Sequence, residues 1–407
     1  MKKKILLITH NFWPENFPIN DIARILGTKY FDLIVLTGKP NYPLGKIYNS
    51  YNPYSIQQEI FYNSIKIIRV PIVPRGSGSF LFLFLNYISF IVSSILFGYF
   101  ILKKKKIDLI FVYAPSPVIH SLVGVFFKFI LKKPLIVWLQ DVWPHSLSSS
   151  GYVKNKIIIN IINIIIKFIY KSSDQILVQS KSFLRILKKN YFCKNLIYLP
   201  NHSSTFSFFK EKKYKINYKL NQNEFNIVYT GNIGTVQDFD VIFKAAKKLT
   251  NLPIKFIFFG EGKNKKKLQK KLILEKISNI FINDYIDKKN LIEIIKKSSA
   301  LIVTIKNDKY LNLIIPSKVQ FYLSCKKPII AVCSGETRKV IIDSGSGLVS
   351  NSGDYKRLYK NISYIYSVKD SVKFKKYKLN GYNYFKKNFT INIIIKKIRD
   401  IISQEIK

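Results

Sequence analysis

Residues 226–237, NIVYTGNIGTVQ, pass from an apolar run into two glycines three residues apart, Gly231 and Gly234. The segment that follows, DFDVIFKAAKKLT (238–250), has the pattern of an amphipathic helix. A strand that turns through glycines into a helix favours phosphate binding, because the backbone approaches the ligand closely and the helix presents its positive end. A tight turn without a ligand is the alternative. The stretch predicts a βα unit with a candidate phosphate site.

The same alternation of apolar runs and helical segments extends in both directions. The further runs are KILLIT (4–9), FDLIVLTG (31–38), IDLIFVYA (107–114), PLIVWLQD (134–141), KFIFFGEG (255–262), NIFINDYI (279–286), ALIVTIK (300–306) and PIIAVCS (328–334). Continuously apolar strands separated by helices indicate parallel sheets covered on both faces. Polar residues 199–223 interrupt the alternation. The fold class predicted is therefore α/β with two doubly wound halves.

The large positive net charge of the chain indicates which kinds of partner it could bind. The 407 residues include 67 Lys and Arg against 23 Asp and Glu, a net charge of +44. We expect no nucleic-acid partner, because the sequence lacks a Cys/His finger, an aromatic RNA-binding signature and a basic arm. An anionic membrane surface fits better, since each Lys or Arg near it contributes about 1 kcal/mol. The alternative is a Lys-rich composition with solvated side chains. Three scattered cysteines fit a reduced, cytoplasmic protein.

Two apolar segments of the first half are candidates for membrane contact. Phe80–Leu102 carries no charge and is followed by Lys103–Lys106, and Lys154–Lys171 is apolar with lysines at both ends. The first is long enough to span a bilayer. It lies between strands of the first sheet, however, so spanning would put the remaining halves on opposite sides of the membrane. Docking on the surface and plain burial are the other two interpretations.

Several motifs together carry a resemblance to a known family. They are FWPENFPIND (12–21), TGKPNYPLGKIY (37–48), RVPIVPRGSGS (69–79), WLQDVWPHS (138–146), TGNIGTVQDFD (230–240) and IPSKVQFYLSCKKPIIAVCSGE (315–336). With them the chain resembles retaining GT-B glycosyltransferases of family 4, of the bacterial L-fucosamine and colanic acid transferase type. The resemblance implies two Rossmann-like domains facing across a cleft. It implies an acceptor-binding domain at 1–205, a donor-binding domain at 206–380, and a final helix, 381–407, that packs back on the first domain.

The resemblance assigns a nucleotide-sugar donor to the turn after residue 230. Its candidate residues are Gly231, Asn232, Gly234 and Gln237. Many family members have Arg and Lys where Asn232 and Gln237 stand, so a phosphate-binding cation must come from elsewhere. Lys318 is that candidate, both for donor binding and for catalysis.

Residues near Lys318 complete the expected donor site. Ser317 and Gln320 are expected to contribute, with an ordinary helix-capping box as the alternative reading of Ser-x-x-Gln. The family's two glutamates fall on Leu313 and Phe321, neither of which accepts a hydrogen bond from a side chain. Recognition of the ribose is therefore reassigned to Glu336, which is alternatively a first-turn carboxylate of its helix.

The first half supplies the other expected site residues. Gln140 stands where many relatives have a His that contacts the donor sugar, and Asp141 is expected either to orient a hydroxyl or to cap the following turn. Glu15 and Asn16 are expected to face the acceptor, with a plain turn as the alternative. Pro18 stands where the subfamily commonly has Arg, which puts acceptor-phosphate binding by that loop in doubt.

The function expected from the resemblance is transfer of a sugar with retention. The donor would be UDP-linked N-acetyl-L-fucosamine or a similar amino sugar, and the acceptor a polyprenyl-diphosphate-linked oligosaccharide of O-antigen, capsule or exopolysaccharide. We expect neither a cofactor nor a metal, and a peripheral location on the cytoplasmic face of the bacterial inner membrane. The alternatives are a UDP-sugar epimerase of the same fold and an inactive nucleotide-sugar-binding scaffold.

Overall fold

The alternation of apolar and helical segments produces two sheets in the computed structural model, which describes residues 2–144, 155–203 and 220–406. The chain divides into two units. The first comprises Met1–Asn201 and Asn392–Lys407, and the second comprises His202–Ile391. Lys154 and most of the polar stretch 199–223 lie outside the described residues.

The first unit is built on an eight-stranded sheet within the described residues, in the order β3-β4-β2-β1-β5-β6-β7-β8. Its strands are β1 (Lys4–Ile8), β2 (Asp32–Gly38), β3 (Gln57–Phe61), β4 (Ile65–Val70), β5 (Leu109–Ala114), β6 (Leu135–Leu139), β7 (Gln175–Val178) and β8 (Leu196–Tyr198). All neighbouring pairs are parallel except β3 with β4. Ile5 of the central strand lies opposite Leu33 on one side and Leu109 on the other. Every residue of β5 and β6 is buried, so both faces of the sheet are covered at these strands.

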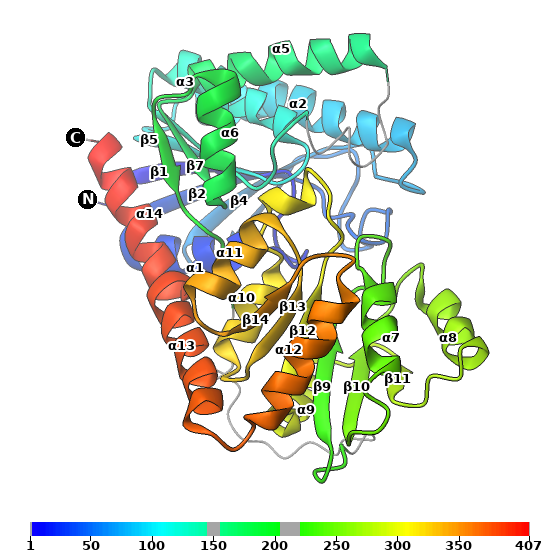
Figure 1. Ribbon diagram of the computed structural model, residues 1–407. Coiled ribbons are helices and arrows are strands. Elements are labelled where there is room, and N and C mark those ends of the chain that lie inside the picture. The colour runs from blue at the N-terminus through cyan, green and yellow to red at the C-terminus, as the bar shows by residue number, and fades with distance from the viewer. Residues whose placement is uncertain (1, 145–154, 204–219, 407) are drawn as a thin grey trace. The chain divides into compact units, whose positions relative to one another are not determined.

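The helices of this unit are α1 (Pro18–Ile25), the π-helix η1 (Leu26–Tyr30), α2 (Phe80–Leu102), the 3-10 helix η2 (Val118–Ser121), α3 (Leu122–Leu131), α5 (Lys156–Ser172), α6 (Lys181–Tyr191) and α14 (Ile391–Glu405). Helix α2 packs against β2, β4 and α3, and α3 packs against α5 (Figure 1). Within the described part, α2 is the one helix long and apolar enough to cross a membrane, by length and composition alone. Its buried side contacts the sheet, so α2 is also a structural layer of the fold.

Helix α14 closes the first unit although it comes from the end of the chain. Its buried residues are Ile394, Ile395, Ile398, Ile401 and Ile402. The Arg399 guanidinium lies 5.5 Å from the centroid of the Tyr30 ring, at the end of η1. The boundary predicted at 380/381 is wrong in detail, because α13 continues through that point and packs on α10 of the second unit. The chain returns to the first unit only at 391/392.

The second unit has a six-stranded sheet within the described residues, in the order β11-β10-β9-β12-β13-β14. Its strands are β9 (Phe225–Thr230), β10 (Ile254–Phe259), β11 (Ile280–Asn283), β12 (Ala300–Thr304), β13 (Ile329–Val332) and β14 (Gly347–Ser350). Every neighbouring pair is parallel. Parallel strands end at one edge, so the loops after β9, β10 and β12 meet there.

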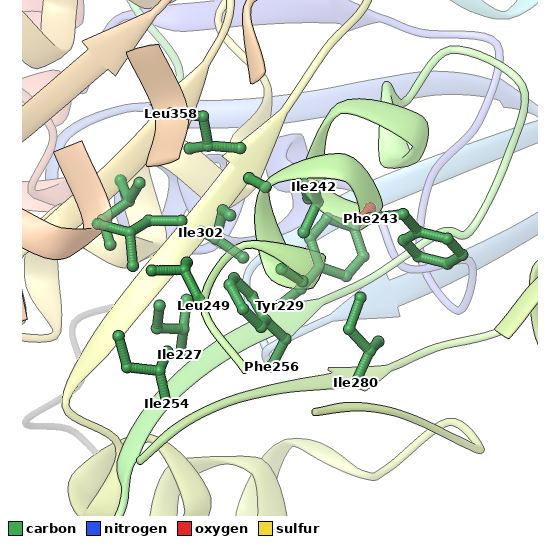
Figure 2. Close-up of a cluster of buried hydrophobic side chains, with 14 of the residues drawn as sticks. Ile227, Tyr229, Ile242, Phe243, Leu249, Ile254, Phe256, Ile280, Ile302 and Leu358 are labelled. Carbon is green, nitrogen blue, oxygen red and sulfur yellow. The ribbon is translucent and has the colours of Figure 1, made fainter. Parts of the chain in front are cut away.

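The helices of the second unit are α7 (Phe239–Lys247), α8 (Lys265–Leu274), α9 (Lys288–Lys297), the 3-10 helix η4 (Leu311–Leu313), α10 (Ser317–Ser324), α11 (Gly335–Asp343), α12 (Tyr355–Ser367) and α13 (Val372–Asn388). Two apolar clusters form, each from alternate side chains of the strands. Figure 2 shows one of them, in which Ile227 and Tyr229 of β9 lie among Phe256, Ile242 and Ile302. This packing fixes the end of β9, where the candidate site begins.

Candidate functional site

The turn after β9 is held by the loop after β10. Gly231 has φ of +120°, a conformation that favours glycine, and its amide donates to the Phe259 carbonyl at 2.9 Å. A Cβ on Gly260 would stand 1.9 Å from the Gly231 carbonyl oxygen. The two loops therefore meet backbone to backbone, and the Gly-x-Gly after β10 is a part of the site that the sequence analysis left unassigned. Its signal was the second pair of glycines after an apolar strand.

The Gln237 side chain takes part in the turn itself, and its contact with a donor stays a prediction. Its Oε1 accepts a hydrogen bond from the Gly234 backbone amide at 2.9 Å, and Asn264 Nδ2 donates to the Gly234 carbonyl at 3.0 Å. The Gln237 side chain therefore stabilises this turn by a hydrogen bond to the backbone three residues earlier in the chain. The Gly231 and Gly234 amides are both engaged within the protein, and donor binding at these two glycines stays a prediction. Asn232 is exposed on this turn, and its contact with a donor stays a prediction.

Lys318 lies at the same turn, although it is far away in sequence. Its Nζ donates to the Tyr229 hydroxyl at 2.6 Å and lies 3.9 Å from the centroid of that ring. A Cβ placed on Gly231 would stand 3.2 Å from Nζ. Burial lowers the pKa of Lys318 to about 7. The structure thus brings together the glycine turn and the cation that the sequence analysis assigned to it.

Helix α10 holds Lys318 in place through the next turn of the helix. The Tyr322 hydroxyl accepts a hydrogen bond from the Thr230 amide at 2.8 Å, so α10 is tied to the end of β9. Ser317 is exposed at the first position of α10, after Pro316 as the N-cap residue. The capping box is therefore wrong. Gln320 is 2% exposed, so direct donor binding by its side chain is not supported.

Glu336 lies in the first turn of α11 and is 3% exposed. Gly335 beside it has φ of +62° and lies so close to the loop that carries Leu313 that a Cβ would stand 2.0 Å from the Asn312 carbonyl oxygen. The Thr337 hydroxyl donates to the Ile314 carbonyl at 3.0 Å. These contacts join α11 to η4, ahead of α10. Recognition of a ribose by Glu336 stays a prediction.

In the first unit, Glu15 is a structural brace. It is 2% exposed, and its carboxylate accepts hydrogen bonds from the Asn11 side chain and from the amides of Phe12, Asn41 and Tyr42, at 2.7–3.3 Å. Burial raises the pKa of Glu15 although these donors oppose the rise. The carboxylate joins the loops after β1 and β2, so the prediction that it faces the acceptor is wrong. Asn16 is exposed, and its role stays a prediction.

Two buried cations near this brace were missed. Arg69 of β4 is 0% exposed; it donates to the Glu59 carboxylate and to the Trp13 carbonyl. Lys39, after β2, donates to the Gln57 side chain. Burial, then the Arg69 guanidinium, lowers the pKa of Lys39 to about 8. A charge inside an apolar run is the sequence signal that marks such residues.

Asp141 caps its own turn after β6. One carboxylate oxygen accepts a hydrogen bond from the Val142 amide at 2.8 Å, and the other accepts one from the Trp143 indole at 3.3 Å. Of the two roles expected for Asp141, capping is the one seen. The other role, orienting a hydroxyl, stays a prediction.

Gln140 belongs to a chain of three side-chain amides, with Gln179 and Asn201. The Gln179 nitrogen donates to the Gln140 backbone carbonyl at 2.5 Å, which fixes the orientation of the first amide. Asn201 then donates to the Gln179 oxygen at 3.4 Å and to Gln140 Oε1 at 2.7 Å. Gln140 Nε2 is left buried without a partner in the described part of the chain. The group that Gln140 offers to a ligand is consequently a hydrogen-bond donor.

Most of the second unit matches a known protein family. Residues 210–382 match the family described as Glycosyl transferases group 1. The chain is also similar to the probable glycosyltransferase WbjE of Pseudomonas aeruginosa, with 23% identity over 222 residues, which cover 52% of this chain and 54% of WbjE. The match thus spans about half the length of this relative. The second unit carries a glycosyl transferases group 1 domain.

Solved structures extend the likeness to both units. A glycosyltransferase from Rickettsia africae superposes with a TM-score of 0.71 at 14% identity, over 100% of this chain and 99% of its own. HepE of Anabaena, in complex with UDP and glucose, gives 0.67 at 12% identity over 99% and 100%. WaaG, a glycosyltransferase involved in lipopolysaccharide biosynthesis, gives 0.60 at 12% over 98% and 99%. The predicted GT-B fold, with two parallel α/β sheets, is confirmed.

Proposed function

We propose that this protein is a glycosyltransferase that uses a nucleotide-diphospho-sugar. One observation carries the proposal: the Lys318 ammonium lies against Gly231, at the glycine turn of a glycosyl transferases group 1 domain. A lysine there can pair with the donor diphosphate as a point charge. Asn232 and Gln237 leave this turn without the two cations usual in family 4, so Lys318 takes over their task. Family 4, and within it the L-fucosamine transferase type, is the subfamily we propose.

We infer a UDP-linked donor and transfer with retention. HepE, which shares the fold, binds UDP and glucose. In a front-face substitution the leaving phosphate helps to deprotonate the attacking hydroxyl, so that no protein nucleophile is needed. Lys318 would stabilise the charge that develops on the diphosphate without a metal. Gln140 Nε2 would donate to an oxygen of the sugar, and N-acetyl-L-fucosamine or a similar amino sugar is the donor we propose.

The acceptor we propose is a polyprenyl-diphosphate-linked oligosaccharide. WaaG acts in lipopolysaccharide biosynthesis, and bacterial surface polysaccharides of this kind are built on lipid carriers. O-antigen, capsule or exopolysaccharide is the product class. The enzyme would work on the cytoplasmic face of the inner membrane.

A membrane surface is the partner we propose for the first unit. Helices α2, α3 and α5 expose large apolar side chains next to lysines: α2 exposes Phe84, Leu96 and Phe100, α3 exposes Phe129, and α5 exposes Ile157, Ile161, Ile164 and Phe168. Such a surface suits a helix layer that lies in the interface, with lysines at the headgroups. The packing of the inner side of α2 on the sheet favours docking over spanning.

Release of UDP tests the reaction. With a panel of UDP-sugars, we expect the full-length protein to release UDP only when the lipid-linked acceptor is present. An epimerase of the same fold would release UDP without the lipid, and a scaffold would release none under either condition. UDP release that needs no acceptor would replace the transferase proposal by the epimerase.

Gln140→Glu tests the donor character of the amide. The variant keeps an oxygen for Asn201 but puts a carboxylate oxygen where Nε2 stands. We expect about a tenfold loss of kcat/KM at pH 8, the size of one hydrogen bond of about 1.4 kcal/mol, with partial recovery towards pH 6. The recovery follows because burial raises the pKa of a carboxyl group, and the protonated form donates again. A matched Gln222→Glu variant should keep the wild-type pH profile; a parallel loss at both pH values would refute the donor role.

A further inference from the structure

Arg75 stands beside the start of α2 between two aromatic rings. Its guanidinium carbon lies 5.4 Å from the centroid of Tyr42 and 5.9 Å from that of Tyr87. The loop that carries it is fixed, because the Arg75 amide donates to the Asn41 side chain at 3.1 Å and the Gly76 amide donates to the Gly45 carbonyl at 2.9 Å. The rings and the loop hold the guanidinium in one place before any ligand arrives.

The charge of Arg75 is uncompensated in the described part of the chain, where it makes no ion pair. Two buried or partly buried carboxylates of the same unit, Glu59 of β3 and Glu15 of the loop after β1, have other partners. Glu59 is taken by Arg69, and Glu15 is filled by Asn11 and by backbone amides, including that of Tyr42, the residue that stacks on Arg75. Neither of these two carboxylates therefore neutralises the Arg75 guanidinium, which is available to pair with an external anion.

One nitrogen of a neighbouring imidazole also lacks a hydrogen-bond partner in the described residues. His10, whose ring lies 5.5 Å from that of Tyr87, is 1% exposed, and its Nε2 has no hydrogen-bond partner in the described residues. Burial lowers the pKa of His10 to about 3, with Arg75 among the lesser causes. The imidazole is therefore neutral, and the positive charge of this corner belongs to the guanidinium.

An apolar surface begins directly after Arg75. Phe80, Leu81, Phe84 and Leu85 of the first turns of α2 are all exposed. A ligand with an anionic head and a hydrocarbon tail would match both features, with its head at Arg75 and its tail along α2. An inorganic anion would use only the first feature, and an uncharged lipid only the second.

We propose that Arg75 binds the diphosphate of the lipid-linked acceptor. This inference rests on the proposed function, because it names the acceptor site of that reaction. Arginine presents a planar fork of donors that pairs with phosphate oxygens in two parallel hydrogen bonds. The residue thereby supplies the phosphate contact that was in doubt because Pro18 replaces an arginine in the first loop.

Farnesyl diphosphate, inorganic diphosphate and farnesol are the probes for this site. We expect the full-length protein, titrated in a calorimeter, to bind farnesyl diphosphate more tightly than either of the other two. Arg75→Gln should weaken farnesyl diphosphate about tenfold and leave farnesol within twofold. Arg75→Lys keeps the charge but loses the planar fork of donors. Its affinity for farnesyl diphosphate should therefore lie between those of the wild type and Arg75→Gln. The Lys variant carries the test if the Gln variant does not fold.

Controls separate this proposal from the function it rests on. Arg185→Gln, an exposed arginine of α6 in the same unit, should bind farnesyl diphosphate as the wild type does. UDP binding should be unchanged in Arg75→Gln, since the donor turn lies in the second unit. Three results would each overturn the Arg75 site. Farnesyl diphosphate could bind Arg75→Gln as tightly as the wild type, or the substitution could weaken farnesol as much as farnesyl diphosphate. Inorganic diphosphate could also bind the wild type as tightly as farnesyl diphosphate does. Failure of UDP release with the Arg75 effect intact would overturn only the transferase proposal.

Discussion

Lys318→Ala is expected to lower kcat/KM for the UDP-sugar by about 5- to 150-fold, or roughly 1–3 kcal/mol, the scale of a charge-assisted hydrogen bond. The ammonium is held at Gly231 by the Tyr229 hydroxyl and ring, so its loss removes a preorganised charge. Steady-state kinetics with the cognate donor measure the effect. The fold should remain intact, because the buried cation is a cost of the unliganded protein. We therefore expect Lys318→Met to unfold at the same or a higher temperature.

The pH dependence of the same residue gives a second measurement. With the pKa of Lys318 at about 7, the free protein loses the ammonium proton above neutrality, whereas the diphosphate complex requires it. UDP affinity should therefore fall with rising pH between 7 and 9, by at most about tenfold per unit. Lys318→Arg, whose guanidinium stays charged, should remove the slope. Lys318 would not be the phosphate-binding cation if UDP affinity kept its pH slope in Lys318→Arg. The same conclusion would follow if a folded Lys318→Ala variant kept the wild-type kinetics.

Replacing Lys103–Lys106 by glutamine should cut binding to anionic vesicles far more than binding to neutral ones. These four lysines are exposed at the end of α2. At about 1 kcal/mol each near an anionic surface, they contribute at most about 4 kcal/mol, so we expect a loss of between about tenfold and 10³-fold. Sedimentation with liposomes of phosphatidylglycerol and of phosphatidylcholine alone measures it. Salt should weaken the anionic part, because exposed charges are screened within about 8 Å at physiological ionic strength.

A variant of equal charge serves as the control. Glutamine at Lys263, Lys266, Lys267 and Lys270, all exposed around α8 of the second unit, removes the same four charges from the other domain. It should leave vesicle binding nearly unchanged. Equal losses on both lipids for the α2 variant would argue against electrostatic docking, and protease protection that put the two units on opposite sides would establish a spanning helix.

Much of the fold could be predicted because buried strands of a parallel sheet have a continuous apolar pattern. Runs such as 4–9 and 225–231 lie on β1 and β9, and the helical segments between them form as expected. Strand β3 was missed because its sequence, QQEIF, is polar. It pairs antiparallel at the edge of the sheet, where one side remains solvated.

The site was predicted less completely, because a side chain's role depends on neighbours that are distant in sequence. Lys318 was named from the sequence as the phosphate-binding cation, and its ammonium lies beside Gly231; its contact with phosphate stays a prediction. Glu15 was misjudged because its partners Asn41 and Tyr42 come from the loop after the next strand. Gln140 was named as a candidate, but the Asn201 amide that orients it is 61 residues away, and no local pattern reveals such a contact.

The place of α14 has a consequence for the order of events on the ribosome. The first unit lacks its last helix until residues 391–405 have emerged, whereas the second unit is complete once synthesis has passed Ile391. Domains generally fold as units during synthesis, the N-terminal one first, but here the sheet that is made first must wait for a helix that is made after the whole second unit. The surface that α14 covers with five buried isoleucines stays open until that helix has been made, so a nascent chain of 1–201 lacks part of the core of its own domain.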